Sequence, residues 1–336
     1  MELQVRRKSV PGICQMVSFF MRHWFLILLA AIFGLGYHQS LRFQPMLDLH
    51  GVRDFIVFCV MFAMGITLPA GKIRKNLGSP KPSLLAIFTN TFCVPLLVLP
   101  FYYFLPSDLF GGLFVTAIVP STLASASVWT RRAGGDDAVS MMTTVVTNLG
   151  CVLVVPVGIW LVLGQQVQID PWSQFWKLSF LVALPLVLSQ ITRRLGLADW
   201  ADRNKANFSF ATQLGILSMV FWGSVASASH PLEAASSWLD NEWFTISLLV
   251  FSVISTHCAA VTLGVRSAQY LGLPQEHQIA IGFSGGQKTL MVGLQIAIDC
   301  GVSVLPMIIY HLGQLVIDTL IADRWSSYHQ RERHEE

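Results

Sequence analysis

Residues 284–289 read S-G-G-Q-K-T and interrupt a segment, roughly 276–298, that is otherwise apolar. A lysine at the centre of a membrane costs about 3 kcal/mol even on the lenient insertion scale. Lys288 lies about ten residues from either end of the segment, roughly 15 Å along a helix, so its ammonium cannot reach the membrane surface. We therefore expect Lys288 to face a polar interior, either with a functional role or as a structural buried lysine.

Further polar or helix-breaking residues lie in similar apolar stretches. The complete candidate site for a substrate or ion is Asn90, Pro120, Ser121, Thr122, Ser125, Ser127, Ser140, Thr144, Asn148, Gly285, Gly286, Gln287, Lys288, Thr289, His311 and Gln314. Polar groups at membrane depth typically mark a substrate or ion pathway. The alternative for each Ser or Thr is a hydrogen bond to a carbonyl of its own helix.

These residues do not fit an enzyme. An intramembrane protease of the two-aspartate type needs paired carboxylates, whereas Asp318 stands alone near the end of an apolar segment. No G-x-S-x-G sequence marks a serine nucleophile. The six cysteines form no C-x-x-C pair, which argues against a disulfide framework or a zinc site. We expect neither catalysis nor a cofactor.

The elements that carry the candidate residues are membrane helices by composition. Of the 336 residues, 53% are hydrophobic and 12% are charged, compared with about 25% charged in ordinary soluble domains. Apolar runs of the length that crosses a membrane lie at 19–37, 52–70, 83–104, 109–131, 136–163, 174–195, 206–228, 243–271, 276–298 and 302–322. The expected fold is an all-α polytopic membrane protein with ten transmembrane helices.

Most of the basic residues lie in segments on one side of the membrane in this layout. With a cytoplasmic N-terminus, all of the 22 Lys and Arg residues lie in cytoplasmic segments except Arg42, Arg53, Lys177 and Lys288. The positive-inside rule predicts this for an even number of spans. We expect a multi-pass protein of the plasma or inner membrane, with both termini cytoplasmic. The same distribution leaves no basic patch for a nucleic acid.

Ten spans divide near residue 170 into two sets of five, which predicts two repeats inverted in the membrane. The predicted parts are a cytoplasmic N-terminal segment 1–18, a first repeat 19–163, a second repeat 174–322 and a cytoplasmic tail 323–336. The fourth and ninth spans carry Pro, Gly and small hydroxyl residues at matching places. Paired broken helices indicate a transport site at the midplane, although Pro and Gly are frequent in membrane helices generally.

Three stretches resemble the bile acid:sodium symporter superfamily, and the resemblance is closest to its divergent branch typified by solute carrier family 10 member 7. They are V-P-S-T-L-A-S-A-S-V-W-T-R-R-A-G-G-D-D-A (119–138), F-S-G-G-Q-K-T (283–289) and I-Y-H-L-G-Q-L (309–315). The resemblance implies two inverted five-helix repeats in which helices 4 and 9 are broken and cross. It also implies a panel of helices 1, 2, 6 and 7 against a core of helices 3–5 and 8–10, with substrate between them.

The resemblance further implies two sodium sites behind the crossing. The corresponding residues here are Ser125, Ser140 and Thr144 for one site, and Asn90, Gln287 and His311 for the other. The acidic residue shared by both family sites corresponds to Phe283, and Lys288 directly follows Gln287. An ammonium beside neutral oxygens disfavours sodium there, so sodium coupling is in doubt and Lys288 is a candidate to replace the ion.

Together these observations favour a secondary active transporter of an organic anion, either bile acid- or sterol-like or a carboxylate amphiphile, that works by alternating access in the lipid bilayer. Half-helix N-termini at the crossing would add positive potential. One alternative is a proton-coupled carrier, since desolvation favours the neutral amine of Lys288. Another is a non-transporting membrane regulator or receptor. The substrate, the coupling to sodium or protons, and the oligomeric state stay open.

Overall fold

The computed structural model describes residues 11–69, 71, 80–164, 167, 170–229 and 242–335, and the elements within these ranges are all helical. The first half contains α1 (Pro11–His38), α2 (Ser40–Phe43), η1 (Gln44–Asp48), α3 (His50–Ile66), α5 (Lys81–Phe88), η2 (Thr89–Cys93), α6 (Val94–Val98), η3 (Leu99–Tyr103), α7 (Ser107–Ile118), α8 (Ser125–Arg132) and α9 (Asp137–Leu163). The second half contains α10 (Pro171–Leu178), η4 (Ser179–Ala183), α11 (Leu184–Thr192), η5 (Arg193–Leu197), α12 (Ala198–Arg203), α13 (Lys205–Ser229), α14 (Glu242–Tyr270), α15 (Gln275–Gly286), α16 (Leu290–Cys300) and α17 (Leu305–Glu335).

Local sequence determines where several helices begin and end. The Asp136 carboxylate accepts from the backbone N–H of Ala138 and starts α9, and Asp170 accepts from the N–H of Ser173 and starts α10. Aspartate is among the preferred residues at this position because it satisfies a free N–H of the first turn. α16 ends at Gly301, whose φ of +63° is a conformation that glycine adopts without strain. These signals fix the lengths of helices that carry candidate residues.

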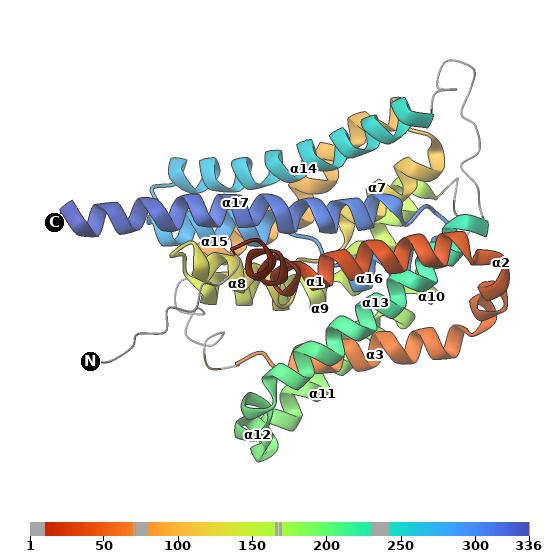
Figure 1. The fold of residues 1–336 in the computed structure, drawn as a ribbon, viewed down its shortest axis with the longest axis horizontal. Helices are drawn as coiled ribbons and strands as arrows, with labels where there is room; N and C mark the ends of the chain where they lie inside the picture. Colours follow the sequence, from red (N-terminus) through yellow and green to blue (C-terminus); the bar gives the residue numbers. More distant parts are fainter. Residues whose placement is uncertain are drawn as a thin grey trace, which may run out of the picture.

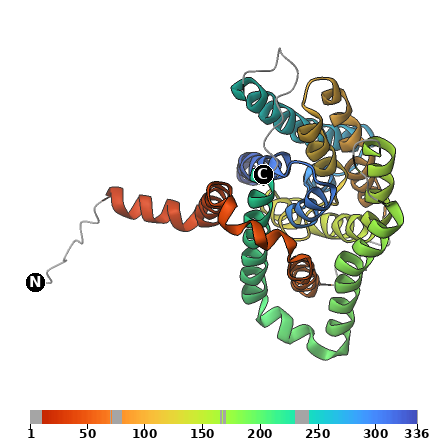
Figure 2. The same ribbon diagram turned by 90° about the vertical axis from the view of Figure 1, so that its right-hand side faces the viewer.

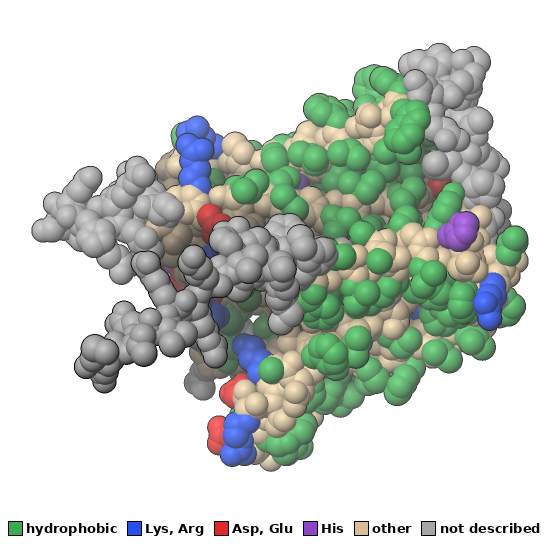
Figure 3. Space-filling view, in the orientation of Figure 1, with side chains coloured by type: hydrophobic (Ala, Val, Ile, Leu, Met, Phe, Trp, Pro, Cys, Tyr) green, Lys and Arg blue, Asp and Glu red, His purple; other side chains and the backbone are tan. Residues whose placement is uncertain are grey.

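Within the described residues, six stretches of helix are long and apolar enough to cross a membrane. They are Lys81–Tyr103, Asp137–Leu163, Pro171–Arg203, Lys205–Ala228, Trp243–Tyr270 and Leu305–Ser326. The bent pair Ser40–Asp48 and His50–Ile66 adds a seventh if it counts as one span. Figure 3 shows hydrophobic side chains over the middle of one face and charged side chains towards its two ends. A lipid-facing surface has this distribution.

Two further apolar segments are each divided into half-helices. Residues 119–124 separate α7 from α8, and residues 287–289 separate α15 from α16. The half-helices have 12, 8, 12 and 11 residues, so none crosses a membrane alone. The two breaks meet, because the backbone N–H of Thr289 donates to the carbonyl of Pro120 over 2.9 Å.

The helices pack in two groups (Figure 1). In the first group, α14, α15 and α17 pack together, and α5, α8 and α9 pack against α15. In the second group, α13 packs against α1 and α3, and α3 packs against α11. Figure 2 shows α10 to α13 sweeping around one side of the molecule beside α3. α16 contacts both α13 and α7, so the half-helix that follows the second break lies between the two groups.

Candidate functional site

Lys288 lies at the meeting point of the two breaks and is fully buried. Its Nζ donates to the carbonyl of Asn90 at 2.7 Å, to Oδ1 of the same residue at 3.2 Å and to the carbonyl of Val119 at 3.1 Å. An ammonium has three N–H bonds, and each therefore has an oxygen acceptor. All three acceptors are neutral, so oriented dipoles stabilise the positive charge.

Both carbonyls are free to accept because the surrounding helices are irregular. Asn90 lies in η2, a π-helical turn in which the N–H of Val94 bonds to the carbonyl of Thr89. The next residue, Pro95, has no N–H, so neither an α-type nor a π-type hydrogen bond reaches the Asn90 carbonyl. Val119 follows the last residue of α7, where carbonyls lack a partner in the helix. A proline and a helix end thus provide the two carbonyl acceptors for the ammonium.

The polarity of the crossing differs from the sequence expectation. Half-helix N-termini were expected there, and α8 and α16 do begin at the two breaks, but the Lys288 ammonium lies against the C-terminal end of α7, which is the negative pole of that helix. The Asn90 amide Nδ2 covers the C-terminal end of α15 in a similar way. It lies 3.1 Å from the Gly285 carbonyl and 2.9 Å from the Gln287 carbonyl. One helix C-terminus at the crossing therefore faces the lysine ammonium, and the other faces an amide.

Gln314 holds the backbone of Lys288 in place. Its Oε1 accepts from the Lys288 N–H over 2.9 Å, and its Nε2 donates to the Lys288 carbonyl over 3.0 Å. The second hydrogen of Nε2 points to Nδ1 of His311 at 2.9 Å. His311 then accepts at Nδ1, which is the neutral tautomer with its proton on Nε2. The candidate residues His311 and Gln314 thus hold the second break in position.

Gln287 connects the two breaks through its side chain. Its Oε1 accepts from the hydroxyls of Thr122 and Ser125 at 2.7 and 2.9 Å. Its Nε2 donates to Oδ2 of Asp318 over 2.5 Å, and Oδ1 of Asp318 lies 2.8 Å from Nε2 of His257. Asp318 and His257 are 0% and 1% exposed. A buried acid–imidazole pair is therefore attached directly to the second break.

Asp318, which was expected to lack a paired carboxylate, has an imidazole as its partner. Its partner His257 lies on α14, 61 residues earlier in the chain, and only the packing of α14 against α17 brings the two together. The sequence analysis did not include either residue among the candidate site residues. The sequence did contain a signal for this pair, since His257 and Asp318 both lie in apolar segments. Ionisable groups at membrane depth are candidates for a functional role by default.

Each hydroxyl of the first predicted sodium set has a hydrogen-bond partner within the protein. The hydroxyl of Ser140 pairs with that of Thr130 at 2.7 Å. Thr144 donates to the carbonyl of Met141 in its own helix over 2.9 Å, as the structural alternative proposed. Ser125 instead faces the second break.

The second predicted sodium set is already occupied by protein donors. Asn90 Oδ1 accepts from the Lys288 ammonium, Gln287 Oε1 accepts from two hydroxyls, and His311 Nδ1 accepts from Gln314. The ammonium takes the place beside Asn90 that a cation would need. This arrangement does not fit a sodium ion.

The other candidate residues support the breaks. Asn148 Nδ2 donates to the carbonyls of Ser121 and Thr144 at 2.8 and 2.7 Å. The Asn148 Oδ1 and Ser121 Oγ atoms are buried, and neither has a hydrogen-bond partner within the described residues. Ser127 donates to the carbonyl of Ala124 over 3.2 Å in its own helix. The first break therefore retains two unpaired polar atoms beside α9.

Gly285 and Gly286 allow α15 to approach its neighbours closely. A Cβ atom on Gly285 would lie 3.0 Å from the Thr89 side chain, and one on Gly286 would lie 2.9 Å from the Val261 side chain. Side chains at these positions would push the break away from η2 and α14. The two glycines thus contribute to the site because they have no side chain and leave room for the neighbouring helices.

Long apolar helices, two broken helices that meet, and a buried cation at the meeting point define a multi-pass integral membrane protein. Residues 23–327 match the model of the SBF-like CPA transporter family, and the chain belongs to that family. Its members are transporters and not enzymes.

Two relatives illustrate the range of the family. Sodium/bile acid cotransporter 7 of Rattus norvegicus is 23% identical over 330 residues, which cover 91% of this chain and 93% of the relative. The probable sodium/metabolite cotransporter BASS4, chloroplastic, of Oryza sativa subsp. indica is 23% identical over 299 residues, which cover 84% of this chain and 70% of the relative. The similarity therefore extends along most of the chain.

Proposed function

We propose that this protein is a secondary transporter of an organic anion in which the Lys288 ammonium replaces the coupling sodium ion. The observation that carries the proposal is the set of three neutral oxygen acceptors around Nζ at the meeting point of the two broken helices. Broken helices that meet at the midplane form the transport site of many secondary carriers. The names of the relatives point to cotransport with sodium, and this chain would differ from them in its source of positive charge.

The proposed architecture has ten spans in two inverted repeats. Six helices and the bent pair satisfy the length criterion, and α1 with the two broken pairs brings the number to ten. The first helix group corresponds to the core and the second to the panel. Alternating access would move the core against the panel, with both chain ends in the cytoplasm.

A fixed cation explains the surroundings of Lys288 better than a proton carrier does. The three oxygens match the three donors of an ammonium. A neutral amine would direct its lone pair at one of these oxygens, which is repulsive. The charge would therefore stay on the lysine during transport and attract an anionic substrate, a bile acid-like or other carboxylate amphiphile.

Flux into proteoliposomes tests the proposal. Uptake of radiolabelled cholate should persist without sodium and fall about tenfold or more in Lys288→Ala, since the loss of one charge contact costs at least 1.4 kcal/mol. Lys205→Ala, a change at an exposed lysine, is the matched control and should transport normally. Uptake that requires sodium and survives Lys288→Ala would contradict the replacement of sodium by lysine. Uptake driven by a proton gradient would favour the proton-coupled alternative.

A further inference from the structure

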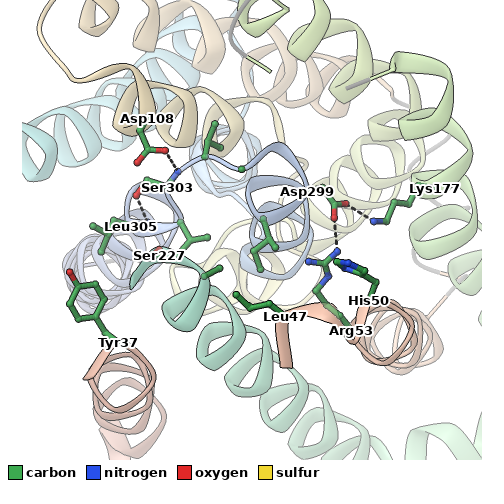
Figure 4. A pocket seen from close by; sticks show the side chains of 15 residues that line it. Tyr37, Leu47, His50, Arg53, Asp108, Lys177, Ser227, Asp299, Ser303 and Leu305 are labelled. Atoms are coloured by element: carbon green, nitrogen blue, oxygen red, sulfur yellow. Dashed lines mark hydrogen bonds and ion pairs between the residues drawn. The ribbon is translucent and has the colours of Figure 1, made fainter. Parts of the chain in front are cut away.

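A cavity of about 410 Å³ lies where α16 ends and α17 begins. α3 and α10 line one side through Arg53 and Lys177, and the turn between α16 and α17 lines the other. Figure 4 shows the guanidinium of Arg53 and the ammonium of Lys177 pointing towards Asp299. The volume is in the range of cavities that bind small organic molecules.

Asp299 joins α16 to α3 and α10 through these cations. Its Oδ1 lies 2.6 Å from the Arg53 guanidinium of α3, and its Oδ2 lies 2.8 Å from the Lys177 ammonium of α10. One turn earlier in α16, Gln295 donates to Asp54 of α3 over 3.0 Å. The side chains of Arg53 and Asp299 are 3% and 10% exposed. Ion pairs this far from water are stronger than pairs on the surface.

Two buried polar groups at the cavity lack a hydrogen-bond partner within the described residues. The Nε–H of Arg53 and the hydroxyl of Ser227 are buried without a hydrogen-bond partner in the described part of the chain, and both residues line the cavity. Leaving such groups unpaired is costly. The N-terminal end of α17 also faces the cavity and contributes the positive pole of that helix. The Asp108 carboxylate accepts from the N–H of Ser303 beside this end.

We propose that this cavity binds the carboxylate of an organic anion, and that the carboxylate displaces Asp299 from Arg53 and Lys177. The inference rests on the proposed transport function and names the group on the substrate that is recognised. Arg53 and Lys177 are already neutralised by Asp299 and Asp54, so an anion gains attraction only by exchange. The exchange also supplies an acceptor to the unpaired Nε–H of Arg53.

The exchange changes how α16 is held to its neighbours. Asp299 links α16 to both α3 and α10, and the arriving carboxylate breaks both links at once. At this end of the molecule α16 is then held to α3 by the hydrogen bond from Gln295 to Asp54 without the two ion pairs. Asp299 is in this sense an internal competitor of the substrate for Arg53 and Lys177.

Calorimetric titration of the full-length protein in lipid nanodiscs tests the exchange. The probes are octanoate, benzoate and cholate, each with its primary amide as an uncharged control. Asp299→Asn should bind the carboxylates about tenfold more tightly than the unchanged protein, because the competitor is removed, whereas Arg53→Gln should bind about tenfold more weakly. Asp137→Asn, which alters an ion pair with the exposed Arg131, should bind as the unchanged protein does.

Lys177→Gln provides a second variant at a more exposed position, 28% exposed, and should weaken carboxylate binding even if Asp299→Asn does not fold. The proposal is overturned if none of the three carboxylates binds Asp299→Asn more tightly, or Lys177→Gln more weakly, or if the amides change equally. If cholate is transported but Asp299→Asn does not bind carboxylates more tightly, the exchange is overturned and the transport function is left intact. If Asp299→Asn binds carboxylates more tightly but the protein transports no cholate, transport is contradicted and the cavity is the site of a receptor.

Discussion

Asp318 and His257 form a buried pair of ionisable residues on the far side of Gln287 from the two hydroxyls. Nε2 of His257 faces the Asp318 carboxylate, and its Nδ1 lies 3.3 Å from the carbonyl of Gly286. Both nitrogens thus face oxygen acceptors, which suits an imidazolium. The hydroxyl of Tyr310 donates to the same Gly286 carbonyl over 2.8 Å. The C-terminal end of α15 is therefore held on two sides, by Asn90 and by this pair.

A double-mutant cycle tests the interaction of this pair. Asp318→Leu and His257→Leu should each lower the free energy of unfolding by about 3 kcal/mol, since each leaves a buried charge without its partner. The double variant should be no less stable than either single variant, because no unpaired charge remains. Thermal unfolding of the purified proteins measures all three changes. Strict additivity of the two single effects would contradict the ion pair.

At the scale of elements, prolines at equivalent places follow two π-helical turns. η2 ends two residues before Pro95, and η4 ends two residues before Pro185. A proline in a helix removes one hydrogen bond and crowds the preceding turn, and the wider π-turn relieves that crowding. At η2 the freed carbonyl belongs to Asn90 and binds Lys288. The π-turn and proline thus occur in both halves of the chain, and in the first half the carbonyl that they free binds the Lys288 side chain.

Replacing these prolines separates their structural and functional effects. Pro95→Ala restores an N–H that can bond to the Asn90 carbonyl or its neighbour and compete with Lys288. We expect uptake to fall about tenfold, because one of the three acceptors is weakened. Pro185→Ala is the matched control in η4–α11 and should transport normally. Equal uptake by both variants would show that the carbonyl at residue 90 does not need to be free.

The breaks were predictable from the sequence, whereas their contacts were not. Pro120 and the pair Gly285–Gly286 disfavour a continuous helix wherever they are placed, so composition alone predicts an interruption. The hydrogen bond from Thr289 to Pro120 joins residues far apart in the chain and depends on how α7 packs against α16 and α8 against α15. Pro95 was not among the candidate residues, since its effect on the carbonyl of residue 90 depends on a π-turn that no periodicity indicates.

At the scale of the whole molecule, the hydrophobicity of the sequence predicted a membrane protein. It also predicted ten spans, which is more than the number of helices that are long enough to cross a membrane alone. A window of about 20 residues averages across a break, so the sequence gives ten segments. The structure divides two of them into half-helices shorter than a membrane. The six or seven helices that meet the length criterion are consistent with ten spans only if the half-helices cross the membrane in pairs.

Labelling with a membrane-impermeant maleimide tests the ten-span layout. Ser79→Cys and Ser236→Cys lie in segments predicted on opposite sides, and both positions fall outside the described residues. We expect label added to the outside of intact cells to react at 236 and not at 79, and label added to inverted vesicles to react in the opposite way. The unsubstituted protein measures reaction of the native cysteines. Reaction of both positions from one side would contradict the layout.

The lysine at the crossing has an electrical consequence, because a cation that belongs to the chain cannot be released. The lysine and a bound monoanion together would carry no net charge, whereas the empty carrier would bear the positive charge of the lysine as it reorients. A membrane potential that is negative inside therefore acts on the empty carrier and holds its charge near the cytoplasm. Each full cycle moves one negative charge, and 100 mV favours its export by about 2.3 kcal/mol, roughly 50-fold at equilibrium.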